Sequence, residues 1–248
     1  MAGATVAGVA ASNNQRQPGG VSMRGDNWLG IHEAGLLRVA GLHSGCEVVD
    51  AQFTSGLTAT PYCVLVDHDW RCVVVSIRGT MSLEDCLCDL QAEPASMEES
   101  GRRWGFDGRE MFAHQGVLAR AEWLRRDLDA QGHLCALLGP ETATNRRPRC
   151  RTYSLYVTGH SLGGSTGVLL SYMLRKDYPS VRCVSITPMG GLLDEAHAES
   201  CGEFVLSAVM GDDVVPRLSV TAMERMRDEV LELIARSKVR VCVGWGRG

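Results

Sequence analysis

Residues 151–172, RTYSLYVTGHSLGGSTGVLLSY, decide how the rest of the chain is interpreted. Residues 153–158 are apolar and rich in β-prone side chains, which predicts a strand. Small residues follow at once, and Val168, Leu169 and Tyr172 then recur at helical spacing. The stretch therefore predicts a strand, a tight turn and a helix.

The turn has the sequence Gly-His-Ser-Leu-Gly, a G-x-S-x-G motif centred on Ser161. Between a strand and a helix, this motif is typical of a nucleophile elbow, where a strained serine projects above the sheet edge and the glycines let strand and helix approach. A glycine-rich turn could instead cradle a phosphate. The dinucleotide pattern G-x-G-x-x-G fails at Ser161, however, and no Walker lysine follows. Ser161 is therefore a candidate nucleophile.

Length and composition favour one α/β domain, because 248 residues with 45% hydrophobic content can bury one substantial core. A formal net charge of −4 provides no basic surface, so nucleic acid is not an expected partner. The ten cysteines are scattered without a CxxC pair, which is typical of reduced core thiols in a cytoplasmic protein. Cys86 and Cys88 lack a second ligand pair, so no metal site is expected.

The N-terminal residues 1–26 predict a flexible tail, and residues 27–248 predict the folded domain. The apolar N-terminus lacks the basic region of a secretory signal, and no run reaches the length of a membrane span. Any contact with membranes or lipid droplets is therefore expected to be peripheral. A basic loop at 145–151 could contact anionic lipid head groups, although such runs are more often solvated loops.

Strands are expected to alternate with helices along the chain. Residues 61–67 and 71–77 predict a hairpin whose second strand is apolar enough to be central, and residues 181–187 and 204–210 predict two further strands. This alternation favours a mostly parallel sheet flanked by helices.

Helical patterns are expected at 28–39, at 82–90 and after His114. Residues 91–112 are mixed in charge and predict an irregular surface excursion. A capping box at Thr221 predicts a last helix. Its buried face would carry Met223, Met226, Val230, Leu233 and Ile234.

Acyl transfer to a serine also needs two hydrogen-bond donors for the developing oxyanion. One is the backbone N–H of Leu162, directly after the serine, and Thr80 follows a neighbouring strand at a position that suits the second. Asp212 and Asp213 follow the last strand. An acid downstream of the serine matches the chain order Ser, Asp, His of this kind of site.

Five stretches in order resemble the class 3 lipases, and most of all the catalytic domain of sn-1-specific diacylglycerol lipases. They are VSIRGT at 75–80, AHQG at 113–116, VTGHSLG at 157–163, PMGGL at 188–192 and GDDVVPR at 211–217. The resemblance covers roughly residues 60–240. It implies an α/β-hydrolase fold.

The resemblance also implies an activity and a set of site residues. Ser161 would be the nucleophile, Asp213 the triad acid with Asp212 a bystander, and Thr80 and Leu162 the oxyanion donors. The implied chemistry is hydrolysis of acylglycerols, diacylglycerol above all, without a cofactor. The helix at 82–90 would occupy the place of the lid of fungal relatives.

One departure from the family concerns the catalytic histidine, which should follow the aspartate. The seven histidines, at 32, 43, 68, 114, 133, 160 and 197, all precede Asp213. We therefore expect a chain truncated before its histidine segment, with the C-terminal part of the fold missing. His197 is a weak substitute because its place in the chain order is wrong. The alternative is a catalytically silent lipase-like protein that binds lipid or another partner.

Overall fold

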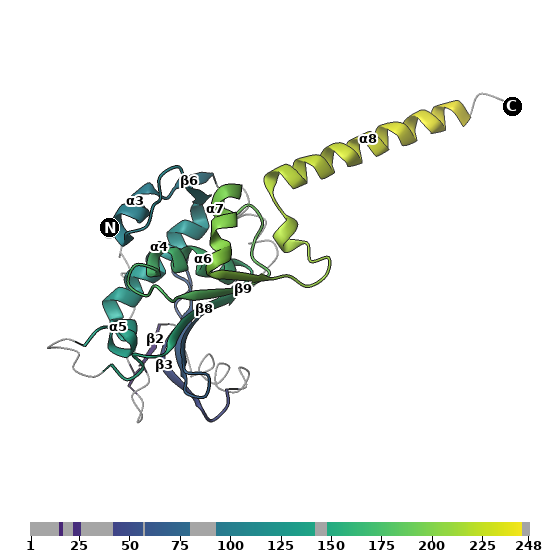
Figure 1. The fold of residues 1–248 in the computed structure, drawn as a ribbon. Helices are drawn as coiled ribbons and strands as arrows, with labels where there is room; N and C mark the ends of the chain where they lie inside the picture. The colour runs from purple at the N-terminus through teal and green to yellow at the C-terminus, as the bar shows by residue number, and fades with distance from the viewer. Residues whose placement is uncertain are drawn as a thin grey trace, which may run out of the picture.

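The computed structural model describes residues 15–16, 22–25, 42–56, 58–79, 93–141 and 148–244. Its main feature is an eight-stranded sheet, and the chain also forms a separate two-stranded sheet (Figure 1). The order in the large sheet is β1 (Gln15–Arg16), β2 (Ser22–Arg24), β3 (Cys46–Gln52), β4 (Tyr62–Asp67), β5 (Cys72–Ile77), β8 (Ser154–His160), β9 (Arg182–Ile186) and β10 (Val205–Ala208). The small sheet pairs β6 (Pro94–Ser96) with β7 (Phe112–His114).

The predicted α/β class with a mostly parallel sheet is confirmed. Neighbouring strands from β5 to β10 are all parallel, whereas β4 is antiparallel to both β3 and β5. The β4–β5 hairpin lies where the sequence predicts it. β5 is central, between β4 and β8, and Val73 and Val75 are fully buried because helices and strands surround them.

Six helices and two short 3-10 turns are described along the chain. They are α3 (Glu98–Trp104), α4 (Gln115–Gln131), α5 (His133–Leu138), α6 (Leu162–Leu174), α7 (Glu195–Ser200), η2 (Cys201–Glu203), η3 (Val215–Arg217) and α8 (Val220–Gly244). Helix α6 packs on β8 and β9, with α4 against it, and every residue of α6 is buried. This burial fits the sequence of α6. Its glycines and small polar residues let the helix lie close to the sheet, and its aliphatic side chains fill the core.

The segment at 91–112 is not the irregular surface excursion that its composition predicts. Within its described part, from residue 93, it forms β6 and α3. Its large apolar side chains Met97, Trp104 and Met111 are buried in a cluster that also contains residues of α6, among them Leu169 and Met173. The backbone N–H of Met97 donates to the carbonyl of Met111 (2.9 Å) and closes the segment on itself.

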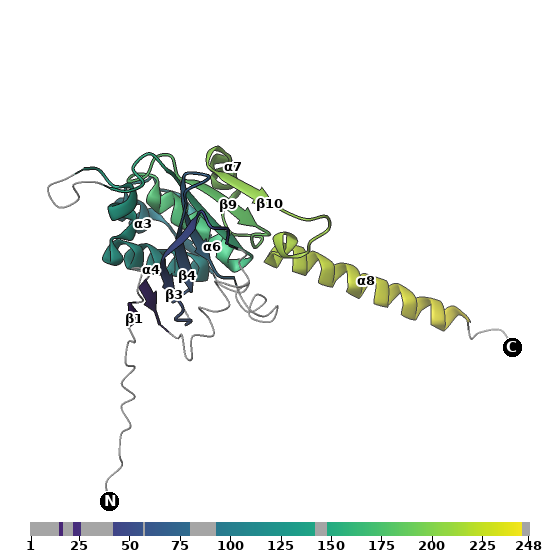
Figure 2. The ribbon, with the colours of Figure 1, turned by 90° about the horizontal axis from the view of Figure 1, so that it is seen from below.

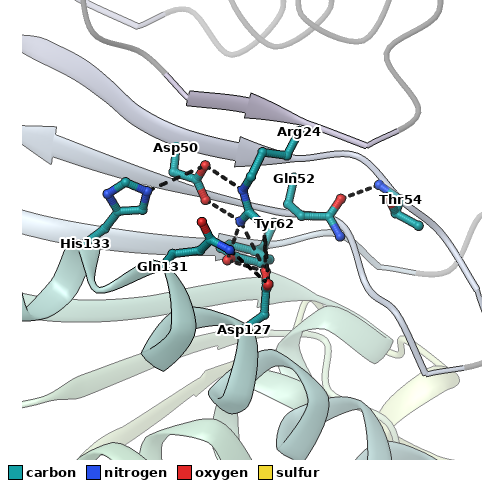
Figure 3. Close-up of polar contacts among 8 residues, drawn as sticks. All are labelled: Arg24, Asp50, Gln52, Thr54, Tyr62, Asp127, Gln131 and His133. Atoms are coloured by element: carbon teal, nitrogen blue, oxygen red, sulfur yellow. Dashed lines mark hydrogen bonds and ion pairs between the residues drawn. The ribbon is translucent and has the colours of Figure 1, made fainter. Parts of the chain in front are cut away.

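An N-terminal part of the chain is also fixed where a tail is expected, because β2 pairs in parallel with β3. Arg24 anchors it (Figure 3). Its guanidinium lies 2.6 Å from Oδ2 of Asp50 and 3.1 Å from Oδ2 of Asp127, and it donates to the hydroxyl of Tyr62. One side chain thus connects β2 to β3, β4 and α4.

Helix α8 differs from its predicted packing. Its first turn is capped by Ser219, whose Oγ accepts the N–H of Ala222 (3.1 Å), and not by Thr221. The helix extends away from the rest of the molecule in both views (Figure 1 and Figure 2), and its apolar face is in solvent: Met226 is 60% and Leu233 61% exposed. The sequence pattern therefore predicted the apolar face of the helix correctly, but the prediction that this face is buried is wrong.

Several predicted features lie outside the described residues. They are the helix at 28–39, Thr80 with the helix at 82–90, Cys86 and Cys88, and residues 145–147 of the basic loop. Among the helices that are described, none combines the length and the apolar character needed to cross a membrane.

Candidate active site

Ser161 lies at the sharp turn between β8 and α6. Its backbone has φ 55° and ψ −123°, a conformation that non-glycine residues rarely adopt and that costs about 1–3 kcal/mol. The N–H of Ser161 donates to the carbonyl of Ile186 at the end of β9 (2.9 Å), which helps to hold the turn. This is the strained strand–turn–helix geometry that the G-x-S-x-G motif predicts.

Three glycines allow the backbone to pack this tightly around the turn. A Cβ on Gly163 would lie 2.4 Å from the carbonyl oxygen of Ile77, and one on Gly159 would lie 2.5 Å from the carbonyl carbon of Gly163. A Cβ on Gly79 would lie 2.4 Å from the carbonyl oxygen of His160. Glycine is therefore required both within the motif and in the segment after β5 that leads toward Thr80.

Leu162 is the first residue of α6 and is 4% exposed. The first amides of a helix have no intrahelical acceptor, and the helix dipole favours negative charge at this end. The predicted oxyanion donor therefore lies where an anion is stabilised. Its predicted partner Thr80 is outside the described residues.

Asp213 follows β10 and is held by two hydrogen bonds. Oδ2 accepts from the hydroxyl of Thr187 and Oδ1 accepts from the N–H of Val215, both at 3.0 Å. Its neighbour Asp212 is exposed. The two adjacent acids thus differ in their surroundings: Asp213 is held near the carboxyl ends of the strands, and Asp212 faces solvent.

Thr187 is a residue that the sequence analysis missed. It is 5% exposed, has a left-handed backbone (φ 49°), and its N–H donates to the carbonyl of Ala208 (2.8 Å). A β-branched residue in this conformation is strained, so the position is determined by its surroundings. The available signal was its place at the end of a predicted strand, at the same end of the sheet as Ser161.

Two histidines of the described ranges make contacts at the start of a helix. His197, the substitute base that we considered, has its Nδ1 2.7 Å from Oδ1 of Asp194, the residue that caps α7. His114 begins α4, and its Nδ1 accepts the N–H of Val117. The structure therefore couples His197 to Asp194 and not to Asp213.

A cavity of about 340 Å³ opens beside the segment that follows β9. The PMGGL stretch contributes to it, and Ser165 in α6 ties that stretch to the elbow helix by accepting the N–H of Met189 (2.8 Å). The described residues that line this cavity do not include Ser161 or Asp213. They are Pro94, Phe112, Ala113, His114, Gly190, Gly191, Leu192, Leu193, Asp194, Ser219, Val220 and Thr221.

The cysteines around the sheet behave largely as core thiols. Seven of those in the described ranges form no disulfide, and five of these seven are buried. Burial raises the pKa of Cys183, which lies under α6, to about 12, so this thiol is neutral and packs as an apolar group. The other two differ in exposure: Cys46 is half-buried and Cys135 is exposed.

Comparisons with known proteins agree with the motifs. The profile of the family described as Lipase (class 3) matches residues 74–223. Human diacylglycerol lipase-alpha is 35% identical over 231 residues, which are 91% of this chain and 21% of that protein. Mouse diacylglycerol lipase-beta is 36% identical over 206 residues, 82% of this chain and 28% of that protein. The chain thus spans between a fifth and a third of the length of these relatives.

Solved structures support the same fold. A lipase from Rhizopus microsporus var. chinensis superposes with a TM-score of 0.57 at 19% identity, covering 76% of this chain and 64% of that one. The Rhizomucor miehei lipase in complex with its propeptide gives a TM-score of 0.57 at 19% identity, covering 76% of this chain and 59% of that one. At this level of identity, the likeness concerns the arrangement of helices and strands.

Proposed function

This chain belongs to the class 3 lipase family, and on that premise we propose that it is a serine ester hydrolase that acts on acylglycerols, with diacylglycerol as its substrate. The proposal includes peripheral contact with a membrane or lipid-droplet surface from the cytoplasm. The observation that carries it is the strained backbone of Ser161, which a structural serine would not need.

In the proposed reaction, Ser161 Oγ attacks the acyl carbonyl while a histidine accepts its proton. The negative charge that develops on the carbonyl oxygen is stabilised by the N–H of Leu162 and by Thr80. The histidine then returns the proton to the departing glycerol oxygen, and the ester bond breaks. Water attacks the acyl-enzyme in the same way, releasing the fatty acid and restoring the serine. No cofactor takes part.

Asp213 has the role of orienting that histidine and stabilising its protonated form. The hydrogen bonds from Thr187 and Val215 fix the carboxylate plane.

A second candidate function is that of a catalytically silent lipase-like protein that binds lipid or another partner. The observation that favours it is the pairing of His197, the substitute base considered, with Asp194 and not with Asp213. General-base catalysis requires such a group within hydrogen-bond reach of Ser161 Oγ.

Labelling by a fluorophosphonate, followed by mass spectrometry, separates the two. The proposed hydrolase should label on Ser161 much faster than a Ser161→Ala control and should release fatty acid from diacylglycerol dispersions. Labelling of the wild-type chain no faster than the control would favour the silent protein.

A further inference from the structure

A histidine, a cysteine and an aspartate converge at the end of the sheet opposite to Ser161. Cys46 begins β3 and is paired in register with Asp67, the last residue of β4, while His43 lies just before β3. Asp67 also pairs with the first residue of β5, whereas the last residue of β5 pairs with the elbow motif. One strand of six residues, roughly 17 Å, separates this cluster from the candidate active site.

The ligand atoms of these three side chains are spaced as around one metal ion. Nε2 of His43 lies 3.1 Å from Oδ2 of Asp67 and 3.2 Å from Sγ of Cys46, and the sulfur lies 3.6 Å from Oδ2. Zinc bonds of about 2.0–2.3 Å in a tetrahedron place neighbouring ligand atoms about 3.3–3.6 Å apart. A zinc ion would therefore require shifts of only a few tenths of an ångström.

Asp67 is oriented for this role by the turn that follows it. Its Oδ1 accepts the N–H groups of Asp69 (3.0 Å) and Trp70 (2.9 Å), which leaves Oδ2 directed at His43 and Cys46. The hydrogen bond from Trp70 lowers the pKa of Asp67, so the carboxylate is ionised at neutral pH. One oxygen thus holds the turn, and the other is presented to the cluster.

The opposite side of the imidazole is supported as well. Nδ1 of His43 accepts the N–H of Gly45 (3.1 Å) and lies 3.2 Å from Oδ2 of Asp69, so a metal at Nε2 would exchange the hydrogen bond from Gly45 for one to Asp69. When Nε2 binds a metal, Nδ1 carries the proton, and a carboxylate that accepts it orients the ring and raises its basicity. A Cβ at Gly45 would lie 2.6 Å from Asp69 Oδ2, so the close approach of Asp69 depends on glycine there.

We propose that His43, Cys46 and Asp67 bind a zinc ion, with solvent as the fourth ligand and Asp69 as the carboxylate behind the histidine. Thiolate, imidazole and carboxylate together suit zinc better than magnesium or calcium, which prefer all-oxygen sites. The His43 side chain is 46% exposed, so solvent reaches the fourth position. The ion would connect the start of β3 to the β4–β5 turn and would stabilise the sheet without entering the ester chemistry.

Titration of the full chain with Co²⁺, as a spectroscopic substitute for zinc, tests the site. We expect one equivalent to produce a thiolate-to-metal charge-transfer band and the visible bands of tetrahedral cobalt, both removed by added zinc. Cys46→Ser should abolish the charge-transfer band. Cys135→Ser, which removes an exposed thiol on α5, is the matched control and should retain it.

Two further measurements extend the test, and the second uses the wild-type chain, so that it does not depend on how a variant folds. Asp69→Asn should weaken zinc affinity by about 10- to 100-fold without changing the ligand set. Removing zinc from the wild-type chain with a chelator should lower its Tm, and zinc should restore it. Absence of the charge-transfer band, or a band that survives Cys46→Ser, would overturn the proposal and leave a hydrogen-bonded cluster. Neither result bears on labelling of Ser161.

Discussion

The hydroxyl of Thr187 donates to Oδ2 of Asp213 across a distance of 3.0 Å, and this bond joins the end of β9 to the loop after β10. The two residues are 26 positions apart, yet parallel pairing of their strands brings them to the same edge of the sheet. Val215 already occupies Oδ1. Thr187 is therefore the contact that fixes the rotation of the carboxylate.

Replacing Thr187 by valine should slow acylation while leaving the fold intact. Valine keeps the β-branched shape but removes the donor, and hydrogen bonds to charged groups are worth about 1.5–3 kcal/mol. We expect the rate of fluorophosphonate labelling to fall by about 10- to 100-fold, with recovery in Thr187→Ser. Equal loss in both variants would indicate that the methyl group, not the hydroxyl, matters.

The adjacent acids Asp212 and Asp213 should differ sharply in their effect on hydrolysis. Asp213→Asn should lower kcat by orders of magnitude if it orients the histidine, since the wrong tautomer is then favoured. Asp212→Asn should be near neutral because that side chain is exposed. Diacylglycerol turnover by the two variants decides the assignment. Similar losses in both would contradict it.

The strained backbone of Ser161 predicts a difference in the free energy of unfolding between two variants at this position. Ser161→Ala and Ser161→Gly should both lose labelling, since each removes the hydroxyl. Ser161→Gly should nevertheless be more stable than Ser161→Ala by about 1 kcal/mol, because glycine adopts φ 55°, ψ −123° without the steric cost. Urea unfolding at equilibrium measures the difference. An alanine variant as stable as the glycine variant would show that the turn is relaxed.

Removing the charge of Arg24 should destabilise the chain more than removing an exposed arginine. Arg24→Met leaves Asp50, whose side chain has no exposed surface, without its nearest cation, and breaking a buried pair typically costs about 3–5 kcal/mol. Arg102→Met removes an exposed ion pair with Glu98 and should cost under about 0.5 kcal/mol. Chemical denaturation of both variants provides the comparison.

The parts of the site that follow from a few consecutive residues were predictable from the sequence. The elbow is set by Gly159, Ser161 and Gly163, and strand, turn and helix are encoded on both sides of it. The distinction between Asp212 and Asp213 came from the family pattern alone, and the structure adds a physical basis in the contacts of Asp213.

Features that depend on contacts across strands were not predictable. The contact of Thr187 with Asp213 and the convergence of His43, Cys46 and Asp67 both require the sheet order, which periodicity does not provide. Residues 93–112 were misassigned because α3 has only seven residues, too few for a periodic signal. The stripe of α8 showed that the helix is amphipathic, but an apolar stripe does not say what covers it.

The position of β10 at the edge of the sheet has a consequence for the behaviour of the protein in solution. In the described chain, β10 pairs with β9 along one side, and Leu206, 65% exposed, projects from it near the exposed Met210. An uncovered strand with apolar side chains is a template for edge-to-edge pairing with another molecule. Self-association of this chain should therefore rise steeply with concentration, and a lysine at Leu206 is the substitution that should suppress it.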